Sequence, residues 1–214
     1  MSQDKLSMAL PNKGRLQEPA IDLLKKAGIR IVRTERQYLA ETSEPNLEII
    51  FVRASDIPAY VYFGAADLGI TGHDLVAERM VEVYELLDLG FGRCELTMAV
   101  PNRSKIYSVQ DLPNDFRIAT EFPNLTNAYF EKLGKKVEVI AVRGSTEITP
   151  MVGLADAIVD LTSTGKTLEA NDLRPIGTLL VSSARLICNK IALRTKEASI
   201  SALVGKIKNI IGDG

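Results

Sequence analysis

The sequence predicts an α/β fold of two doubly wound lobes around a cleft, and two observations carry this prediction. Apolar runs of strand length alternate with helix-length segments along nearly the whole chain, with short links between them. The alternation then restarts after Asp88–Glu95, a stretch with two glycines that suits a crossover. We therefore expect one lobe at 1–91 plus 179–214 and a second at 92–178, with the ligand in the cleft.

The expected strands are short runs rich in Val, Ile and Leu. Ala157–Leu161, for example, is apolar except for Asp160 and has the texture of a buried parallel strand. The set lies at 6–10, 29–32, 47–53, 66–70, 81–87, 96–100, 116–120, 137–142 and 157–161, with a further strand inside 179–188. The segment 34–46 is polar and poorly patterned, so we expect a loop there with at most a short extended piece.

The expected helices have an apolar face, and most end at a glycine. In the first helix Ala20 and Leu24 share one face, and Gly28 sits where a left-handed C-terminal cap belongs. Asp56 and Asp74 are expected to cap the next two helices, which run to about 63 and 80. Further helices are expected at 124–133, 146–152, 167–173 and 196–211, with a helical turn at 108–112.

Composition and charge exclude several classes of protein. The 214 residues carry 26 basic and 27 acidic side chains, well mixed, for a net charge of −1. No basic stripe favours nucleic acid, and no polybasic or long apolar run favours a membrane. Cys94 and Cys188 stand alone, without the spacing of a metal site or a disulfide framework. Since the N-terminus lacks the apolar core of a secretory signal, we expect a cytoplasmic protein.

The loop after the strand 157–161 is rich in hydroxyls, with one glycine and one cation. It consists of Thr162, Ser163, Thr164, Gly165, Lys166 and Thr167. Backbone N–H groups, hydroxyl donors and a glycine that admits close approach together make an anion cradle. An ordinary strand–turn–helix corner with a Ser/Thr cap is the alternative, but Asp160 at the strand end and GKT after it favour phosphate.

Asp160, two residues before this loop, decides between two kinds of phosphate ligand. Gly165, Lys166 and Thr167 match the end of a P-loop, whose first glycine would fall at position 160. Asp160 stands there instead, and a carboxylate is unfavourable where a P-loop wraps phosphates. A phosphorylated sugar suits the pattern better, because Asp160 could accept from ribose hydroxyls while the loop holds the 5′-phosphate. A helix-capping role for Asp160 is the alternative.

Glu147 begins the preceding helix, and the sequence leaves two interpretations of it open. A carboxylate at a helix start gains from the helix dipole and can be purely structural. It could equally accept hydrogen bonds from ribose hydroxyls or from the water shell of a metal ion.

Basic residues of the first lobe are further candidates. Lys13, Gly14 and Arg15 follow the first strand, and Arg53 follows the strand 47–53. These are the strand ends where open α/β sheets bind ligands. Arg36 lies in the polar segment. Most arginines are solvated surface, but the guanidinium fork of these three suits polyphosphate oxygens.

A second strand-to-glycine turn, Gly64–Gly72, contains Asp67, Thr71 and Gly72. Its small residues could admit a nucleotide or could serve tight helix–strand packing. The next residue, His73, is the one histidine in the sequence, and a lone histidine disfavours a catalytic triad or a metal cluster. We expect His73 at the surface or as a helix cap, and no Ser/His/Asp or Cys/His set can be assembled without it. The sequence therefore points away from acyl transfer and toward chemistry done by positioning and charge stabilisation.

Across Glu147–Leu168 the sequence resembles the signature of the ATP phosphoribosyltransferase family. The matching pattern is E-x5-G-x-A-x2-I-x-D-L-x2-T-G-x-T-L, over 22 positions. Supporting segments are PNKGRL at 11–16, VRASDIPAYV at 52–61, GAADLGITG at 64–72 and SSARLICN at 182–189. The resemblance covers essentially the whole chain, with one departure at Asp172, where the family is expected to have glycine.

The resemblance implies the enzyme that opens histidine biosynthesis. It would transfer the phosphoribosyl group of phosphoribosyl pyrophosphate (PRPP) to N1 of ATP and release pyrophosphate. It also implies a fold like that of type II periplasmic binding proteins. Mg²⁺ would be held mainly by the substrate phosphates, with no direct protein ligand.

The family also implies partners. The chain resembles the short catalytic form, without the C-terminal regulatory domain of the long form. Short forms are expected to associate as dimers and to work in a hetero-octamer with a regulatory subunit resembling histidyl-tRNA synthetase.

Under this resemblance each candidate residue receives a role. The loop 162–167 would hold the 5′-phosphate of PRPP, with Asp160 and Glu147 near the ribose or the metal's water shell. Arg36 and Arg53 would be catalytic, stabilising pyrophosphate or the ATP phosphates. The expected ATP-binding residues are Lys13, Gly14, Arg15, Asp67, Thr71 and Gly72.

Other classes share the two-lobed architecture. A solute-binding protein would need an export signal, and the effector lobe of a regulator would need a helix-turn-helix segment; we expect neither here. A phosphoribosyltransferase acting on a different base is the remaining alternative.

Overall fold

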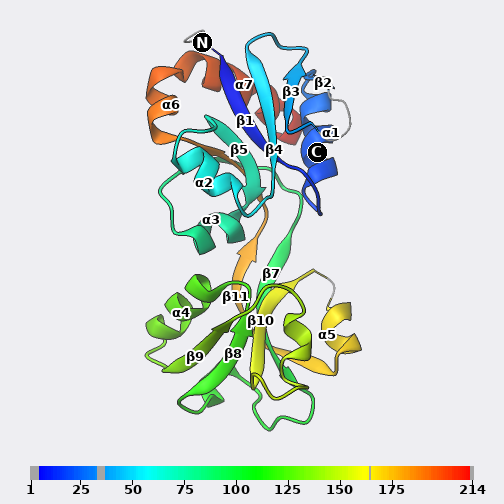
Figure 1. Cartoon of the computed structure of the whole chain (residues 1–214), viewed down its shortest axis with the longest axis vertical. Helices are drawn as coiled ribbons and strands as arrows, with labels where there is room; N and C mark the ends of the chain where they lie inside the picture. Colours follow the sequence, from blue (N-terminus) through cyan, green and yellow to red (C-terminus); the bar gives the residue numbers. More distant parts are fainter. Residues whose placement is uncertain (1–4, 33–36, 164, 213–214) are drawn as a thin grey trace. The chain divides into compact units, whose positions relative to one another are not determined.

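The computed structural model describes residues 5–32, 37–163 and 165–212 (Figure 1). The chain forms two compact units, Met1–Gly92 with Ser183–Gly214 (unit 1) and Arg93–Ser182 (unit 2). The chain returns from unit 2 to unit 1 after Ser182, later than the expected boundary at 178. The reason is that a long strand, β11 (Leu173–Ser182), pairs with β7 (Cys94–Pro101) over its whole length and so belongs to unit 2.

Unit 1 is built on a mixed sheet. Among the described residues this sheet has seven strands in the order β2-β3-β4-β1-β5-β12-β6. They are β1 (Leu6–Pro11), β2 (Ile31–Val32), β3 (Leu39–Thr42), β4 (Leu47–Val52), β5 (Leu68–Gly72), β6 (Tyr84–Asp88) and β12 (Ala184–Cys188). β1 pairs in parallel with β4 and β5, as expected, whereas the outer strands pair antiparallel. The parallel arrangement is limited to the centre because β2 and β3 fold back at one edge and β12 inserts between β5 and β6.

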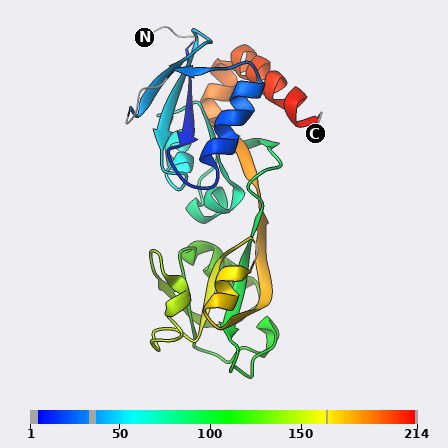
Figure 2. The same cartoon turned by 90° about the vertical axis from the view of Figure 1, so that its right-hand side faces the viewer.

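Side chains of β1 alternate between two apolar layers, because successive strand residues point to opposite faces. Met8 and Leu10 belong to a core that includes residues of α1 (Gln17–Lys26), α6 (Lys190–Thr195) and α7 (Glu197–Gly212). Figure 2 shows α1 in blue and α7 in red on the same side of this sheet. Ala9 belongs to a second core, with α2 (Ile57–Tyr62) and α3 (His73–Arg79). Helices thus cover both faces of the sheet, as in a doubly wound fold.

Unit 2 has its own mixed sheet. Its described strands lie in the order β11-β7-β10-β8-β9, with β8 at Phe116–Thr120, β9 at Val137–Ala141 and β10 at Ala157–Thr162. β8 is parallel to both β9 and β10, whereas β7 is antiparallel to β10 and β11. The carboxyl ends of β8, β9 and β10 therefore meet at one edge of the sheet. α4 (Pro123–Lys132) packs against β9, and α5 (Lys166–Ala170) packs against β11.

Most expected elements are present, with several differences. The expected helix 146–152 is a short 3-10 turn, η2 (Thr146–Ile148), and the expected turn at 108–112 is η1 (Val109–Asp111). The region 173–188 holds two strands rather than one, and α6 was not expected. Asp56 is the N-cap of α2 without a side-chain cap bond, and Gly72 rather than Asp74 is the N-cap of α3. Across the described part of the chain, no helix is long and apolar enough to cross a membrane.

Candidate active site

A small pocket of about 80 Å³ lies at the carboxyl end of β10. Its lining combines two carboxylates with hydroxyls and a glycine. The lining residues are Glu147, Asp160, Leu161, Thr162, Ser163, Gly165, Thr167 and Leu168. The structure thus brings together most of the residues predicted for PRPP; Thr164 lies outside the described residues, and Lys166 is exposed next to the pocket.

The loop around this pocket is fixed at both ends. Thr162 Oγ1 lies 2.8 Å from Thr97 Oγ1 on the neighbouring strand β7. Leu168 is buried and anchors α5 in a small core with Ala99 and Ile158. Gly165 has a φ of +73°, which favours glycine, and no atom lies within 4 Å of the position its Cβ would take. The loop therefore presents open space at the glycine, as a close approach to a ligand requires.

Asp160 is partly buried at the end of β10 and has an unusual acidity. Burial, aided by the negative charges of Glu147 and Glu121, raises the pKa of this carboxyl from its usual 3.8 to about 6. A hydrogen bond from the Leu161 N–H (2.7 Å) opposes the rise. Asp160 therefore changes its charge close to neutral pH, which is typical of functional sites.

Glu121 belongs to this group of carboxylates, and the sequence-based prediction missed it. It follows β8 directly, at the same sheet edge as Asp160, and its Oε1 accepts a hydrogen bond from the Gly144 N–H. The rule that ligands bind beyond the carboxyl ends of strands, applied above to Arg15 and Arg53, also points to this position.

A second group of predicted residues lies at the carboxyl ends of the central strands of unit 1. Lys13, Gly14 and Arg15 follow β1, and Arg53 follows β4; all four are exposed. Arg15 is held in place, because Nη1 donates to the carbonyl oxygen of Gly92 and Nη2 lies 3.6 Å from Asp74 Oδ1. Arg36 lies outside the described residues.

Thr71 and Gly72 end β5 at this same edge, where both also support the fold, and their predicted role in ATP binding stays a prediction. The buried Thr71 hydroxyl donates to the carbonyl oxygen of Ala54 at 2.8 Å. A Cβ on Gly72 would lie only 2.2 Å from Asp74 Oδ1, so glycine is needed to admit that carboxylate. The run 64–72 thus supports tight packing, the alternative that its small residues left open.

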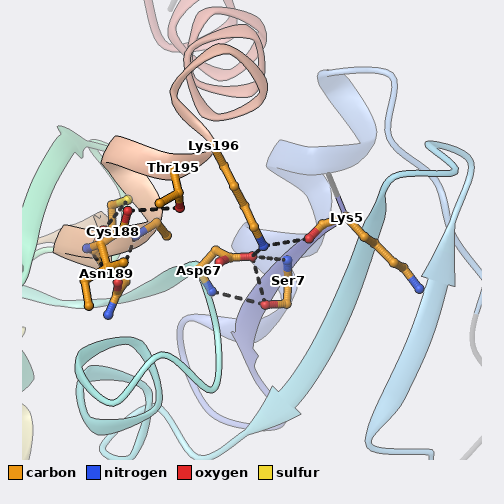
Figure 3. A network of polar contacts seen from close by, with 9 residues as sticks. Lys5, Ser7, Asp67, Cys188, Asn189, Thr195 and Lys196 are labelled. Atoms are coloured by element: carbon orange, nitrogen blue, oxygen red, sulfur yellow. Dashed lines mark hydrogen bonds and ion pairs between the residues drawn. The ribbon is translucent and has the colours of Figure 1, made fainter. Parts of the chain in front are cut away.

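Asp67 does not join the expected ATP-binding residues. It precedes β5, at the opposite end of that strand from Thr71 and Gly72. There its Oδ2 accepts from the Ser7 N–H (2.9 Å) and from Lys196 Nζ (2.8 Å), as Figure 3 shows. Lys196 Nζ also donates to the Lys5 carbonyl oxygen at 2.8 Å. This carboxylate therefore ties the start of α7 to β1, and its predicted role in ATP binding stays a prediction.

The described residues contain no group of three or more His, Cys, Asp and Glu side chains placed to hold a metal ion. His73 begins α3, and its Nδ1 lies 2.9 Å from Glu85 Oε1. Both cysteines are buried, and burial raises the pKa of the Cys188 thiol to about 11, with a smaller contribution from Asp67.

Comparison with known proteins decides the family. The family model described as HisG, ATP phosphoribosyltransferase, matches residues 53–209. The chain belongs to the ATP phosphoribosyltransferase family. The resemblance seen in the sequence is confirmed, and the chain is a member of a family of transferase enzymes.

Curated relatives carry the same name. The ATP phosphoribosyltransferase of Methanocaldococcus jannaschii is 50% identical over 210 residues, covering 96% of this chain and 73% of that protein. That of Methanopyrus kandleri is 54% identical over 185 residues, covering 86% of this chain and 65% of that protein. The chain thus spans roughly two thirds to three quarters of these two relatives.

Solved structures support both the family and the fold. A chain of the ATP phosphoribosyl transferase (HisG:HisZ) complex from Thermotoga maritima matches with a TM-score of 0.85 at 32% identity, covering 98% of this chain and all of that one. A putative L-cystine ABC transporter protein from Listeria monocytogenes matches with a TM-score of 0.62 at 15% identity, covering 98% of this chain and 91% of that one. Likeness to such binding proteins shows the fold alone, and it confirms the expected type II binding-protein architecture.

Proposed function

We propose that this enzyme transfers the phosphoribosyl group of PRPP to N1 of ATP, giving N1-(5-phosphoribosyl)-ATP and pyrophosphate, as the first step of histidine biosynthesis. The observation that carries the proposal is the pocket beyond β10. A hydroxyl- and glycine-rich loop and two carboxylates line one small space there. A sugar phosphate needs this combination, with donors for its phosphate and acceptors for its hydroxyls.

In unit 2 we assign the pocket residues to PRPP. Thr162, Ser163, Thr164, Gly165, Lys166 and Thr167 hold the 5′-phosphate through hydroxyls, backbone N–H groups and the lysine charge. Asp160 and Glu147 accept hydrogen bonds from the ribose hydroxyls. Since ionised carboxylates are acceptors only, Asp160 performs this role in its charged form, above its pKa of about 6.

In unit 1 we assign the basic residues to charge stabilisation. The departing pyrophosphate is a strong anion, and the ribose carbon becomes cationic as the bond to it breaks. Arg53 and Arg36 neutralise the leaving group or the ATP phosphates, and Lys13, Gly14 and Arg15 contact the nucleotide. In this scheme no side chain accepts a proton, and none of the residues proposed for the site is a histidine.

Mg²⁺ is the proposed cofactor, held mainly by the substrate phosphates. When bound, the ion would neutralise negative charge on the phosphates. Glu147 and Asp160 line the same pocket and could accept hydrogen bonds from water molecules bound to such an ion. Mg²⁺ usually keeps several water ligands and prefers oxygen atoms.

We also propose that the chain associates with itself as a dimer and with a regulatory subunit in a hetero-octamer in the cytoplasm. Support comes from the Thermotoga maritima chain of a HisG:HisZ complex, which this chain matches over its whole length. Size-exclusion chromatography with light scattering, with and without a HisZ-type subunit, tests the association. An unchanged molecular mass on mixing would refute it.

One assay tests the reaction. The chain is incubated with ATP, PRPP and Mg²⁺, and pyrophosphate release is followed with and without a HisZ-type subunit. We expect release that requires both substrates. Release with a different base in place of ATP, and none with ATP under either condition, would assign the chain to another phosphoribosyltransferase activity instead.

A further inference from the structure

We propose that Glu121 is a positioning residue of the cradle, whose carboxylate holds the Gly144–Ser145 turn and thereby places Glu147 in the PRPP pocket. This inference rests on the function proposed above. It adds a residue of this chain that lies outside the family signature at 147–168.

Glu121 spans the gap between two neighbouring strand ends. The pairing of β8 with β9 continues one step beyond the strands, since the Val142 N–H donates to the Thr120 carbonyl oxygen at 3.0 Å. From the next residue on β8, Glu121 Oε1 accepts from the Gly144 N–H. The charged acceptor makes this a strong kind of hydrogen bond.

The turn that Glu121 holds needs outside support. Gly144 and Ser145 are both left-handed, with φ values of +81° and +50°. The second of these is unfavourable for a residue with a side chain. η2 follows at once, so this turn sets the direction in which the chain enters η2, whose second residue is Glu147.

The first residue of η2 has anchors of its own. Thr146 is buried and hydrogen-bonds Asp160, and the Thr149 hydroxyl donates to the Thr146 carbonyl oxygen at 2.7 Å. Two contacts therefore fix the chain just before Glu147: Glu121 holds Gly144, and Asp160 holds Thr146. Removing the Glu121 contact leaves only the other.

The charges around Asp160 supply a second readout. Glu121 and Glu147 both raise the pKa of Asp160, while Lys166 and Glu169 on α5 are exposed. On β7, Glu95 accepts from the Thr178 hydroxyl at 2.8 Å. Loss of the Glu121 charge should therefore let Asp160 ionise at lower pH, which a residue that only supports the fold would not do.

The test compares four variants by steady-state kinetics with PRPP. Glu121→Gln keeps an acceptor for the Gly144 N–H but removes the charge, and Glu121→Ala removes both. Glu131, exposed on α4 in the same unit, gives the controls Glu131→Gln and Glu131→Ala. Thermal unfolding of all four confirms folding, and Glu121→Gln alone suffices for the pH profile.

We expect Glu121→Ala to raise KM for PRPP about tenfold with kcat within about threefold, and Glu121→Gln to stay within about threefold in both. The acid limb of kcat/KM should move to lower pH in Glu121→Gln. A KM for Glu121→Ala equal to that of Glu131→Ala, a Glu121→Gln variant as impaired as Glu121→Ala, or an unmoved acid limb would each overturn the proposal.

A measurement without substrate separates this proposal from the function. The Gly144 amide proton should resonate far downfield in the wild type, less far downfield in Glu121→Gln, whose amide is a neutral acceptor, and lose the shift in Glu121→Ala. If the wild type uses no PRPP but the shift behaves as expected, the proposed reaction is refuted while the contact between Glu121 and Gly144 is supported. If the shift is absent from the wild type, the positioning role of Glu121 is refuted.

Discussion

Gly72 has no room for a β-carbon, although its φ of −79° would suit any residue. A Cβ there would lie 2.2 Å from Asp74 Oδ1, and Asp74 is fully buried beside Arg15. Gly72→Ala should therefore displace the carboxylate and lower the free energy of unfolding by about 1–3 kcal/mol.

Gly205, inside α7, is the matched control. No atom lies within 4 Å of the place its Cβ would take. Gly205→Ala should raise the free energy of unfolding by roughly 0.5–1 kcal/mol, because alanine loses less backbone entropy in a helix. Urea unfolding measures both variants, and equal stability of Gly72→Ala and the wild type would contradict the packing argument.

Asp160 should make the folded chain less stable as the pH rises toward neutrality. Its pKa is about 6 in the folded chain, and its usual value is 3.8. Between these values the folded state holds a proton that the unfolded state has released. The contribution of Asp160 to the free energy of unfolding is therefore largest below about pH 4 and is lost as the pH rises through about 6.

Asp160→Asn removes this penalty along with the carboxylate. The variant should exceed the wild type in stability by up to about 3 kcal/mol at pH 7, and the difference should vanish near pH 4. Binding of PRPP should weaken at the same time, because the amide is a poorer acceptor for ribose hydroxyls. Urea unfolding from pH 4 to 7 and calorimetric titration with PRPP test the two effects; a variant no more stable at pH 7 would contradict the first.

Arg53 should matter for turnover far more than other exposed arginines of unit 1. Under the proposed function its guanidinium meets phosphate charge that grows in the transition state, so Arg53→Ala should lower kcat about a hundredfold. Arg194, exposed at the end of α6, gives the control Arg194→Ala. Equal turnover of the two variants would remove Arg53 from the mechanism.

At the scale of elements, the junction of α6 and α7 depends on one ion pair. Lys196 and Asp67 lie 2.8 Å apart, with only 23% and 13% of their side chains exposed. Asp67→Asn leaves the lysine charge partly buried without its partner charge, so the free energy of unfolding should fall by about 2–4 kcal/mol.

The same variant tests the predicted role of Asp67 in ATP binding. Since Asp67 lies at the far end of β5 from the nucleotide residues, KM for ATP should stay unchanged in Asp67→Asn at a temperature where the variant is folded. A raised KM for ATP, with no loss of stability, would support the sequence-based assignment.

Local pattern predicted most elements, and the misses have tertiary causes. The first half of β11 contains Pro175 and Gly177, which resemble loop residues; an edge strand tolerates them, and the register shifts between them. α6 is only six residues long and is capped by Asn189. The amide of Asn189 also donates to the carbonyl oxygens of Val61 and Tyr62, contacts that no local pattern contains.

The pocket beyond β10 could be predicted because its residues lie close together in the sequence. Asp160 and its loop are contiguous, and most of the loop residues line one pocket with Asp160, as their order in the sequence indicated. Asp67 precedes β5 and Gly72 ends it, so the two lie at opposite ends of this strand although they belong to one sequence motif. Glu121 was missed because its partner, Gly144, is brought near only by the pairing of β8 with β9.

At the scale of the whole molecule, unit 1 combines two separate segments of the sequence, whereas unit 2 is formed by one. The main core of unit 1 unites residues from Leu6 to Leu89 with residues from Ala184 to Ile207. β12 pairs with both β5 and β6, so the first segment alone lacks a strand in the middle of its sheet. Unit 2 is one continuous segment with its own sheet.

This difference predicts how fragments behave. The segment 93–182 should fold alone with a cooperative urea transition and should bind PRPP, because every described pocket residue belongs to it. The segment 1–92 should stay unfolded alone and become structured when 183–214 is added, since Ile200, Leu203 and Ile207 of α7 complete its core.

Circular dichroism follows the folding of each fragment, and calorimetric titration follows the binding of PRPP to 93–182, with Asp160→Asn in the same fragment as the control. A fragment 93–182 without a cooperative transition would show that its sheet requires unit 1 to fold. A folded fragment that ignores PRPP would instead move the phosphate site away from β10.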